Sequence, residues 1–460
     1  MIPITSRNTN FILLISSLII FFLSSCVDEI VEPELQSETL TINKFIYDNM
    51  NIFYFWNEDI PYINYKEESD SKAYFYKLLK NPDDKWSFIT DDISALENYF
   101  KGIIKSPGYS IQGYYLNENS NQVYFVIEYV YQNSPASEAG LQRGDIFYKI
   151  NNIELTDENY QDLLNADKLE LTLGQKISSN EIIAIEPTVN IYPEENLKQH
   201  PILATNIIEK EGTIIAYLAY SSFISDHDQD LSDIFMEFKN AGVNELVLDL
   251  RYNSGGSVAS AQKLASKIVP SKEDGKLLIR EKYNTTLSEN NFDLNFKIES
   301  DNLNLNRVYI LTTENTASAS EMIIYGLDPY MDVIQIGKET HGKYYASYTI
   351  SDNNEDPDKR RHNWAIQPIV LRSENATNNI NYQQGLIPDY ELNDNVYNAD
   401  LGNEDEHFLA TAISHITTGN FSPDIKSSSS KLQNNRELKN LKEKIDPLYG
   451  TMFINTPELK

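Results

Sequence analysis

The sequence predicts a multidomain α+β chain with a helical N-terminal unit, a β-rich middle part and an α/β core. Three changes in the apolar pattern support this prediction. Apolar residues recur at helical spacing over 39–102, alternate with a period of two over 103–190, and form alternating strand-like and helix-like segments over 200–420. Because 460 residues exceed the size of one ordinary core, two or three domains are expected.

Composition limits the possible functions. The chain carries 68 Asp and Glu against 38 Lys and Arg, a formal net charge of −30, which repels phosphate backbones and excludes a nucleic-acid partner. An apolar share of 41%, with 30 Tyr and 19 Phe, is enough to fill real cores and excludes global disorder. The six histidines show no metal-ligand spacing and Cys26 is the single cysteine, so no metal, no other cofactor and no disulfide is predicted.

The N-terminal residues 1–25 are predicted to be a signal peptide. An apolar run over 11–23 is too short to span a bilayer comfortably, follows Arg7, and ends in small residues directly before Cys26. This junction resembles a bacterial lipobox, which implies cleavage before Cys26 and a lipid on its thiol. An uncleaved anchor helix is the alternative. Residues 26–38 are acidic and contain Pro33, as in a tether. The resemblance implies a lipid-anchored protein of the bacterial cell envelope, at the outer membrane, on its periplasmic or surface face.

The helical unit over 39–102 contains two apolar stripes. Ile42, Phe45, Ile46 and Met50 form the first, and residues 73–79 form the second. Both stripes are rich in large apolar and aromatic side chains, which are more often core than ligand site. We expect this unit to be structural.

The middle unit over 103–190 contains a distinctive segment at 134–151. It reads as a short helix that begins near Pro135 and is stopped by Gly140, followed by a turn at Gly144 and a strand. This segment closely resembles the centre of a PDZ domain of the bacterial protease type. PDZ domains bind extended C-terminal peptides by adding a strand to a sheet edge. The resemblance implies a carboxylate-binding loop at Gly108, Tyr109, Ser110 and Ile111, although this loop departs from the usual glycine-rich form.

The predicted α/β core over 200–420 contains three segments with candidate catalytic residues. The first, DLRYNSGGS at 249–257, takes a buried strand into a turn with Gly255 and Gly256, whose backbone N–H groups can face a ligand. The second, TASASE at 316–321, places Ser318 between a strand and an apolar helix. The third, GKETHGK at 337–343, follows another buried strand and ends in Lys343.

Together, these three segments resemble the C-terminal processing (tail-specific) peptidases, which use a Ser-Lys dyad on a ClpP/crotonase-like core. The string GLIPD at 385–389 resembles a later motif of the same family. The resemblance implies that Ser318 is the nucleophile and that Lys343, 25 residues later, is its base. Burial would lower the pKa of Lys343 so that its neutral amine accepts the serine proton. The N–H of Ala319, with one from Gly255 or Gly256, would form the oxyanion hole.

Rival assignments remain within the same segments. Ser320 is a second serine but breaks the spacing, Lys338 adjoins Glu339, and His341 could form a Ser-His pair. The family often carries a glutamine four residues after the lysine, and here Ser347 takes that position as a possible base-orienting residue.

The predicted function is a serine-type endopeptidase of the cell envelope that recognises C-terminal or unfolded segments of protein substrates through its PDZ domain. The alternative is a catalytically weak or inactive peptide-binding scaffold of the same fold. The remaining tail over 421–460 contains a charged stretch over 432–445 that predicts a helix, flexible or packed on the surface. The oligomeric state is left open.

Overall fold

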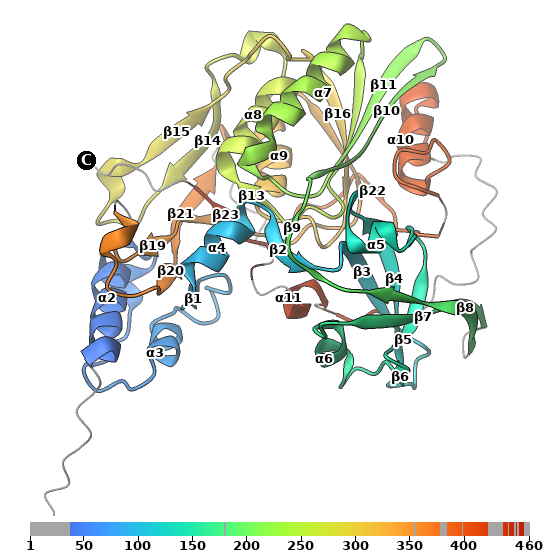
Figure 1. The fold of residues 1–460 in the computed structure, drawn as a ribbon. Helices are drawn as coiled ribbons and strands as arrows, with labels where there is room; N and C mark the ends of the chain where they lie inside the picture. The colour runs from blue at the N-terminus through green and yellow to red at the C-terminus, as the bar shows by residue number, and fades with distance from the viewer. Residues whose placement is uncertain are drawn as a thin grey trace, which may run out of the picture.

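Figure 1 shows the computed structural model of the chain. The residues it describes are 37–178, 181–353, 356–377, 384–397, 399–421, 436–439, 441–445, 448 and 450–454. The predicted signal peptide, Cys26 and the tether up to residue 36 lie outside the described residues. Within the described ranges, no helix is both long enough and apolar enough to cross a membrane.

The N-terminal unit is helical, with one short strand. Its elements are α2 (Ser37–Phe53), η2 (Asn57–Asp59), α3 (Ser71–Lys77), β1 (Phe88–Thr90) and α4 (Ile93–Phe100). The predicted stripe of α2, including Ile46 and Met50, is fully buried. Asp70 and Asp92 cap α3 and α4 by accepting bonds from backbone N–H groups of the first turn. The strand was not predicted, and because β1 pairs with β20 (Ala365–Gln367) it joins this unit to the core.

The middle unit is an antiparallel sheet with the order β3-β4-β5-β7-β8, with β6 beside β5. The elements are β3 (Tyr109–Tyr115), β4 (Val123–Val130), α5 (Pro135–Glu138), β5 (Ile146–Ile150), β6 (Ile153–Glu154), α6 (Tyr160–Leu164), β7 (Leu169–Ser178) and β8 (Glu181–Ile191). As predicted, α5 begins at Pro135 and Gly140 follows it with a positive φ of 80°. Strand β3 lies at one edge of this sheet.

A two-stranded ribbon connects this middle unit to the core. It consists of β2 (Ile103–Ser106) and β9 (Glu194–Lys198), which pair antiparallel. A second connection is the buried side chain of Arg143, which donates to the hydroxyl of Tyr252 at 2.6 Å and to Asp394 at 3.3 Å. The middle unit therefore contacts the core next to the turn that follows residue 249.

The core is built on a six-stranded sheet with helices on both faces (Figure 1). Its strands, in sheet order, are β10 (Ile202–Lys210), β11 (Thr213–Tyr220), β12 (Glu245–Asp249), β16 (Arg307–Thr312), β17 (Asp332–Gly337) and β22 (Tyr390–Glu391). All neighbours are parallel except β10 and β11. Helices α7 (Asp228–Asn240), α8 (Val258–Ile268) and α9 (Ala319–Leu327) cover one face, and α10 (His407–Thr418) covers the other. Alternate residues along each strand face opposite layers, so both faces are apolar.

A second six-stranded sheet was not predicted from the sequence. Its order is β13 (Gly256–Ser257), β23 (Met452–Phe453), β18 (Tyr345–Ser347), β21 (Ile369–Glu374), β14 (Leu277–Lys282) and β15 (Phe292–Asn295). Strand β19 (Ile350–Ser351) instead pairs with β20. The second strand of this sheet comes from the C-terminal tail of the chain.

The described residues of the tail, 436–439, 441–445, 448 and 450–454, pack against two other parts of the protein. Helix α11 spans Leu441–Ile445, the end of the helix predicted over 432–445, whereas the described residues 436–439 are not helical and pair with β3 instead. Leu438 and Leu441 are buried in the apolar cluster of the middle unit. In Figure 1, α11 lies beside that unit, whereas β23 lies in the second sheet.

Candidate active site

The turn after β12 is fixed by a buried arginine. Arg251 has no exposed surface and binds three carboxylates, with nitrogen–oxygen distances of 2.6 Å to Asp249 and 2.9 Å to both Asp394 and Glu406. A buried cation with this many charge-assisted bonds holds its backbone rigidly. The glycine turn that follows is therefore placed by the core.

Asn253 shapes the glycine turn itself. Its side-chain oxygen accepts the N–H of Gly255 at 2.9 Å, and its amide donates to the carbonyl of Tyr220. Gly255 and Gly256 have φ angles of 115° and 132°, which only glycine adopts readily. Because the N–H of Gly255 already has a partner, Gly255 does not fit the predicted role of oxyanion donor. Its contribution is space, since a Cβ there would lie 2.7 Å from the Cβ of Ser318.

The nucleophile turn is hydrogen-bonded to this glycine turn. The carbonyl of Asn253 accepts from the N–H of Ala317 at 3.2 Å and from the hydroxyl of Ser320 at 3.0 Å. Ser318 precedes α9 with φ 65° and ψ −117°, a strained conformation for a residue with a side chain. Its hydroxyl is buried and has no hydrogen-bond partner among the described residues. Ser318 therefore lies at a helix N-terminus, with a hydroxyl that no structural bond occupies.

Lys343 is buried in the loop that follows β17. It is 2% exposed, and burial lowers the pKa of its amine to about 7, although the negative charges of Asp84 and Glu321 oppose this shift. The amine donates to the carbonyl of Gly450 at 2.7 Å and lies 5.9 Å from the ring centre of Trp86. A lysine in this environment is substantially neutral near pH 7 and can accept a proton.

Glu321 joins the serine and the lysine through their backbones. Its Oε2 accepts the N–H of Ser318 at 2.7 Å and that of Lys343 at 2.9 Å, and its Oε1 accepts the N–H of Gly342 and the hydroxyl of Thr340, both at 2.6 Å. Burial raises the pKa of Glu321 to about 7, against these bonds. No role was predicted for Glu321 from the sequence. The available signal was its place three residues after Ser318 at a helix start, as in a capping box.

The rival residues have other partners or more exposed positions. The hydroxyl of Ser320 donates a hydrogen bond to the carbonyl of Asn253. Lys338 is ion-paired with Glu391 at 2.8 Å, not with its neighbour Glu339. His341 is partly exposed, and its backbone N–H donates to the carbonyl of Thr316.

Ser347 does not contact Lys343 through any hydrogen bond of the described residues. Its hydroxyl donates to the carbonyl of Met452 at 2.9 Å and accepts from the side chain of Gln367 at 3.0 Å. The predicted base-orienting role therefore has no hydrogen bond to support it. A buried glutamine does stand near this position, but it comes from β20.

The predicted carboxylate-binding loop has internal partners. The N–H of Gly108 donates to the hydroxyl of Ser106 at 3.0 Å, and Ser110 donates to Glu128 at 2.7 Å. Tyr109 is partly buried and the side chain of Ile111 is fully buried in the core of the unit. Ser110 and Ile111 also bind Lys442 of the tail.

One pair of histidines that is distant in sequence meets in space. Nε2 of His200 and Nδ1 of His227 lie 3.2 and 2.7 Å from the same oxygen of Asp230. This cluster is on the surface and contains none of the catalytic candidates.

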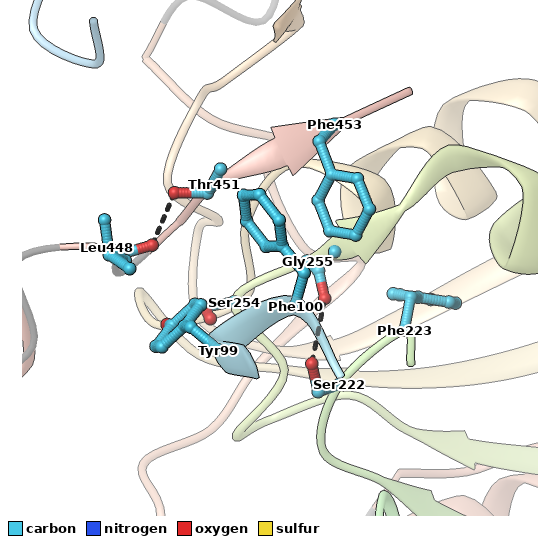
Figure 2. Close-up of a pocket in the computed structure, with 10 residues that line it drawn as sticks. Tyr99, Phe100, Ser222, Phe223, Ser254, Gly255, Leu448, Thr451 and Phe453 are labelled. Carbon is cyan, nitrogen blue, oxygen red and sulfur yellow. Dashed lines mark hydrogen bonds between the residues drawn. The ribbon is translucent and has the colours of Figure 1, made fainter. Parts of the chain in front are cut away.

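A cleft opens beside the glycine turn (Figure 2). Four parts of the chain line it: the end of α4, the segment around residue 222, the glycine turn and the tail. Its lining residues are Tyr99, Phe100, Ser222, Phe223, Ser254, Gly255, Gly256, Leu448, Thr451 and Phe453. The lining combines aromatic rings with hydroxyl and backbone groups, and a cleft of this mixed character beside the turn of Ser318 can accept a peptide.

Comparison with known proteins identifies the family. The model of Peptidase family S41 matches residues 214–392, the S41 N-terminal domain matches 41–88, and a PDZ domain matches 126–173. A solved structure assigned to the S41 proteases, from Bacteroides fragilis, is 30% identical with a TM-score of 0.69, covering 81% of this chain and 97% of the other. The chain belongs to peptidase family S41. The predicted order of helical N-terminal domain, PDZ domain and peptidase core is confirmed.

More distant S41 relatives carry names that describe an activity. A carboxyl-terminal-processing protease of Synechocystis is 21% identical over 335 residues, covering 69% of this chain and 73% of the relative. A CtpA-like serine protease of Staphylococcus aureus is 24% identical over 285 residues, covering 60% of this chain. This chain spans about half the length of the Staphylococcus relative, 53%.

Proposed function

We propose that this S41 protein is a serine endopeptidase that cleaves protein substrates, with Ser318 as nucleophile and Lys343 as general base. One observation carries the proposal. A single carboxylate oxygen of Glu321 holds the backbone N–H groups of both residues, and the amine of Lys343 is buried with a pKa of about 7. These are the conditions under which a lysine activates a serine at neutral pH.

The first half of the reaction forms an acyl-enzyme. The neutral amine of Lys343 takes the proton of the Ser318 hydroxyl as the oxygen attacks a peptide carbonyl. The N–H of Ala319, at the N-terminus of α9, and that of Gly256 are the proposed donors to the oxyanion, where the helix dipole adds positive potential. The protonated Lys343 then gives its proton to the leaving amine.

The second half hydrolyses the acyl-enzyme. Lys343, neutral again, removes a proton from water, which attacks the ester carbonyl, and the proton then returns to Ser318 as the new C-terminus leaves. In the structure the amine donates a hydrogen bond to the carbonyl of Gly450, and a neutral amine can keep this bond while its lone pair accepts the proton of Ser318.

We also propose that the PDZ domain binds substrate segments by strand addition at β3. This strand is a sheet edge, and the described tail residues already pair with it through backbone bonds at Gly113 and Tyr115. Edge pairing reads mainly the peptide backbone, so it suits unfolded segments and C-termini of varied sequence.

Location at the cell envelope through a lipid on Cys26 is part of the proposal. It is supported by the short apolar run and small residues that precede Cys26 in the sequence. Metabolic labelling with a radioactive fatty acid is expected to label the full chain and not a Cys26→Ala variant. Equal labelling of the two would overturn the anchor.

The catalytic proposal is tested with the protein from residue 27 onward and an unfolded protein substrate. Ser318→Ala and Lys343→Met are each expected to lower kcat by at least about 1000-fold, because each removes one half of the dyad. Ser320→Ala and Lys338→Met are the matched controls, from the same turn and the same loop, and should retain most activity.

Two outcomes contradict the assignment in different ways. Activity that persists in Lys343→Met but disappears in Lys338→Met would show that the base is Lys338 and not Lys343. If the unsubstituted protein is as inactive as Ser318→Ala on varied substrates, the non-catalytic scaffold replaces the peptidase.

A further inference from the structure

The C-terminal tail contacts both places where a substrate peptide is expected to bind. Its first described residues, 436–439 and 441–445, lie on the PDZ domain, and its last ones, 450–454, include strand β23 of the second sheet beside the catalytic residues. The two parts are close in sequence but occupy separate domains. The described residues of the tail therefore reach both the PDZ domain and the catalytic centre.

At the PDZ domain the tail adds a strand to the edge of the sheet. The carbonyl of Arg436 accepts the N–H of Tyr115, and the N–H of Leu438 donates to the carbonyl of Gly113, both at 2.9 Å. Glu437 forms an antiparallel bridge with Tyr114. This is the geometry by which such a domain binds a separate peptide.

The PDZ domain also has a fitted place for one tail side chain. Leu438 is 4% exposed, and a Cβ on Gly113 would lie 2.6 Å from its Cδ1. The absence of a side chain at residue 113 therefore makes room for Leu438. Lys442, one turn further on, donates to Ser110 and Ile111 and pairs with the buried Glu128.

At the catalytic centre the tail adds a second strand. β23 runs parallel to the glycine turn on one side, with Met452 opposite Gly256, and parallel to β18 on the other. The N–H of Ile454 donates to the carbonyl of Ser347 at 3.0 Å. The hydroxyl of Ser347 in turn donates to the carbonyl of Met452. An extended segment thus fills the space between the proposed oxyanion donors and the strand after the base.

The same segment is hydrogen-bonded to the amine of the proposed base, Lys343. The carbonyl of Gly450 accepts the amine of Lys343, while the hydroxyl of Ser318 has no partner among the described residues. Phe453, three residues further on, stacks on Phe100 with ring centres 4.1 Å apart at the cleft shown in Figure 2. An aromatic pair in a cleft gives binding energy and selects the side chain that enters it.

We propose that the C-terminal segment is an internal peptide ligand of the protein's own substrate track, and that Phe100 forms a subsite for an aromatic side chain. The substrate track is the space between β13 and β18. This inference rests on the proposed function, which makes that space the binding site for substrate peptides. Substrates then bind as an extended strand between β13 and β18, place an aromatic residue on Phe100, and compete with the tail. A tethered competitor is present at a high effective concentration, so it lowers the apparent affinity for any free peptide.

Peptide binding to the inactive Ser318→Ala protein tests the competition without requiring catalysis. The probe is a fluorescent peptide with the sequence of residues 448–454, measured by anisotropy. Leu438→Asp and, separately, Phe453→Asp should each tighten binding at least about tenfold, because each unseats the tail at one end. Lys439→Asp, at the exposed neighbouring position, should change nothing.

The two substitutions act in different domains, so a folding defect in one does not remove the test. Unchanged binding in both Leu438→Asp and Phe453→Asp, with thermal unfolding still cooperative, would overturn the internal ligand. Tight binding in all variants including Lys439→Asp would do the same.

The aromatic subsite is tested in the Phe453→Asp background with two probes, the peptide above and one with alanine in place of its phenylalanine. Phe100→Ala should weaken the first peptide about tenfold, about 1.4 kcal/mol, and leave the second unchanged. Equal weakening of both peptides would overturn the subsite. If these binding results hold but the unsubstituted protein cleaves nothing, the catalytic proposal fails and the peptide track stands.

Discussion

The nucleophile turn and the base loop are held in different ways. The turn around Ser318 is bound by core residues close to it in space, above all the carbonyl of Asn253 and the carboxylate of Glu321. The backbone of Lys343 shares that carboxylate, but its amine is surrounded by the N-terminal domain and the tail. The position of Ser318 is therefore fixed by the peptidase core, whereas the protonation state of Lys343 also depends on the N-terminal domain and the tail.

The largest effect is expected where the two segments meet. Glu321→Ala would leave three buried N–H groups without an acceptor, at a cost of about 1–3 kcal/mol each, and would misplace both members of the dyad. We expect loss of at least about 3 kcal/mol of unfolding free energy and about 100-fold in kcat/KM. Denaturant unfolding and kinetics measure these, and Glu339→Ala, at an exposed position in the same loop, is the control. Similar kinetics in both variants would show that Glu321 does not position the dyad.

Gly255→Ala should disturb the serine side alone. The new Cβ would lie 2.7 Å from the Cβ and 2.9 Å from the hydroxyl of Ser318. We expect kcat to fall about 100-fold, since such a displacement is comparable with misplacements that cost this much. Gly275→Ala also places a side chain at a positive φ, 74°, but its Cβ would meet nothing within 4 Å, so kcat should stay unchanged there. Equal losses in both would attribute the effect to strain.

The pH profile reports the lysine side. The proposed mechanism uses Lys343 in its neutral form, so kcat/KM should rise about tenfold per pH unit below about 7 and level off above it. Asp84→Asn removes a negative charge that raises the pKa of Lys343, so the midpoint should move to lower pH. Asp83→Asn, at the exposed neighbouring position, should leave it in place. A midpoint that moves upward in Asp84→Asn would contradict this assignment of charges.

The smallest effect is expected at the contact between the base loop and the tail. Ser347→Ala removes one hydrogen bond to Met452, worth about 1 kcal/mol. The fluorescent peptide of residues 448–454 would lose the same hydrogen bond as the tail with which it competes, so in the Ser318→Ala background its apparent affinity should change by less than about twofold, far less than in Phe453→Asp. Weaker binding would mean that Ser347 serves the incoming peptide more than the tail.

Local sequence patterns were sufficient to predict most of the elements around the site. The strand before residue 249, the helix after Ser318 and the helix beginning at Pro135 lie within a residue or two of their predicted positions. Each depends on contacts within a few residues, such as an apolar run, a cap or a stopping glycine. Within these elements, the resemblance to the tail-specific peptidases singled out Ser318, Ala319 and Lys343 before their surroundings were known.

Three features could not be read from such patterns. Whether Gly255 donates its N–H to an oxyanion depends on Asn253, whose side chain takes that group. Whether Ser347 orients Lys343 depends on Met452, more than a hundred residues away. The second sheet combines strands from four distant parts of the chain, two of them only two residues long. Short strands carry too little periodicity to be recognised in isolation.

The sequence by itself determined which residues can do chemistry, because a reactive serine needs a particular turn and that turn is encoded within a few positions. Only the tertiary structure decided what those residues touch. The carboxylate shared by Ser318 and Lys343, the neutral amine and the tail that binds it all arise from burial and from contacts between distant segments. A pKa and a hydrogen-bond partner are properties of the surroundings in space, and adjacent sequence does not contain them.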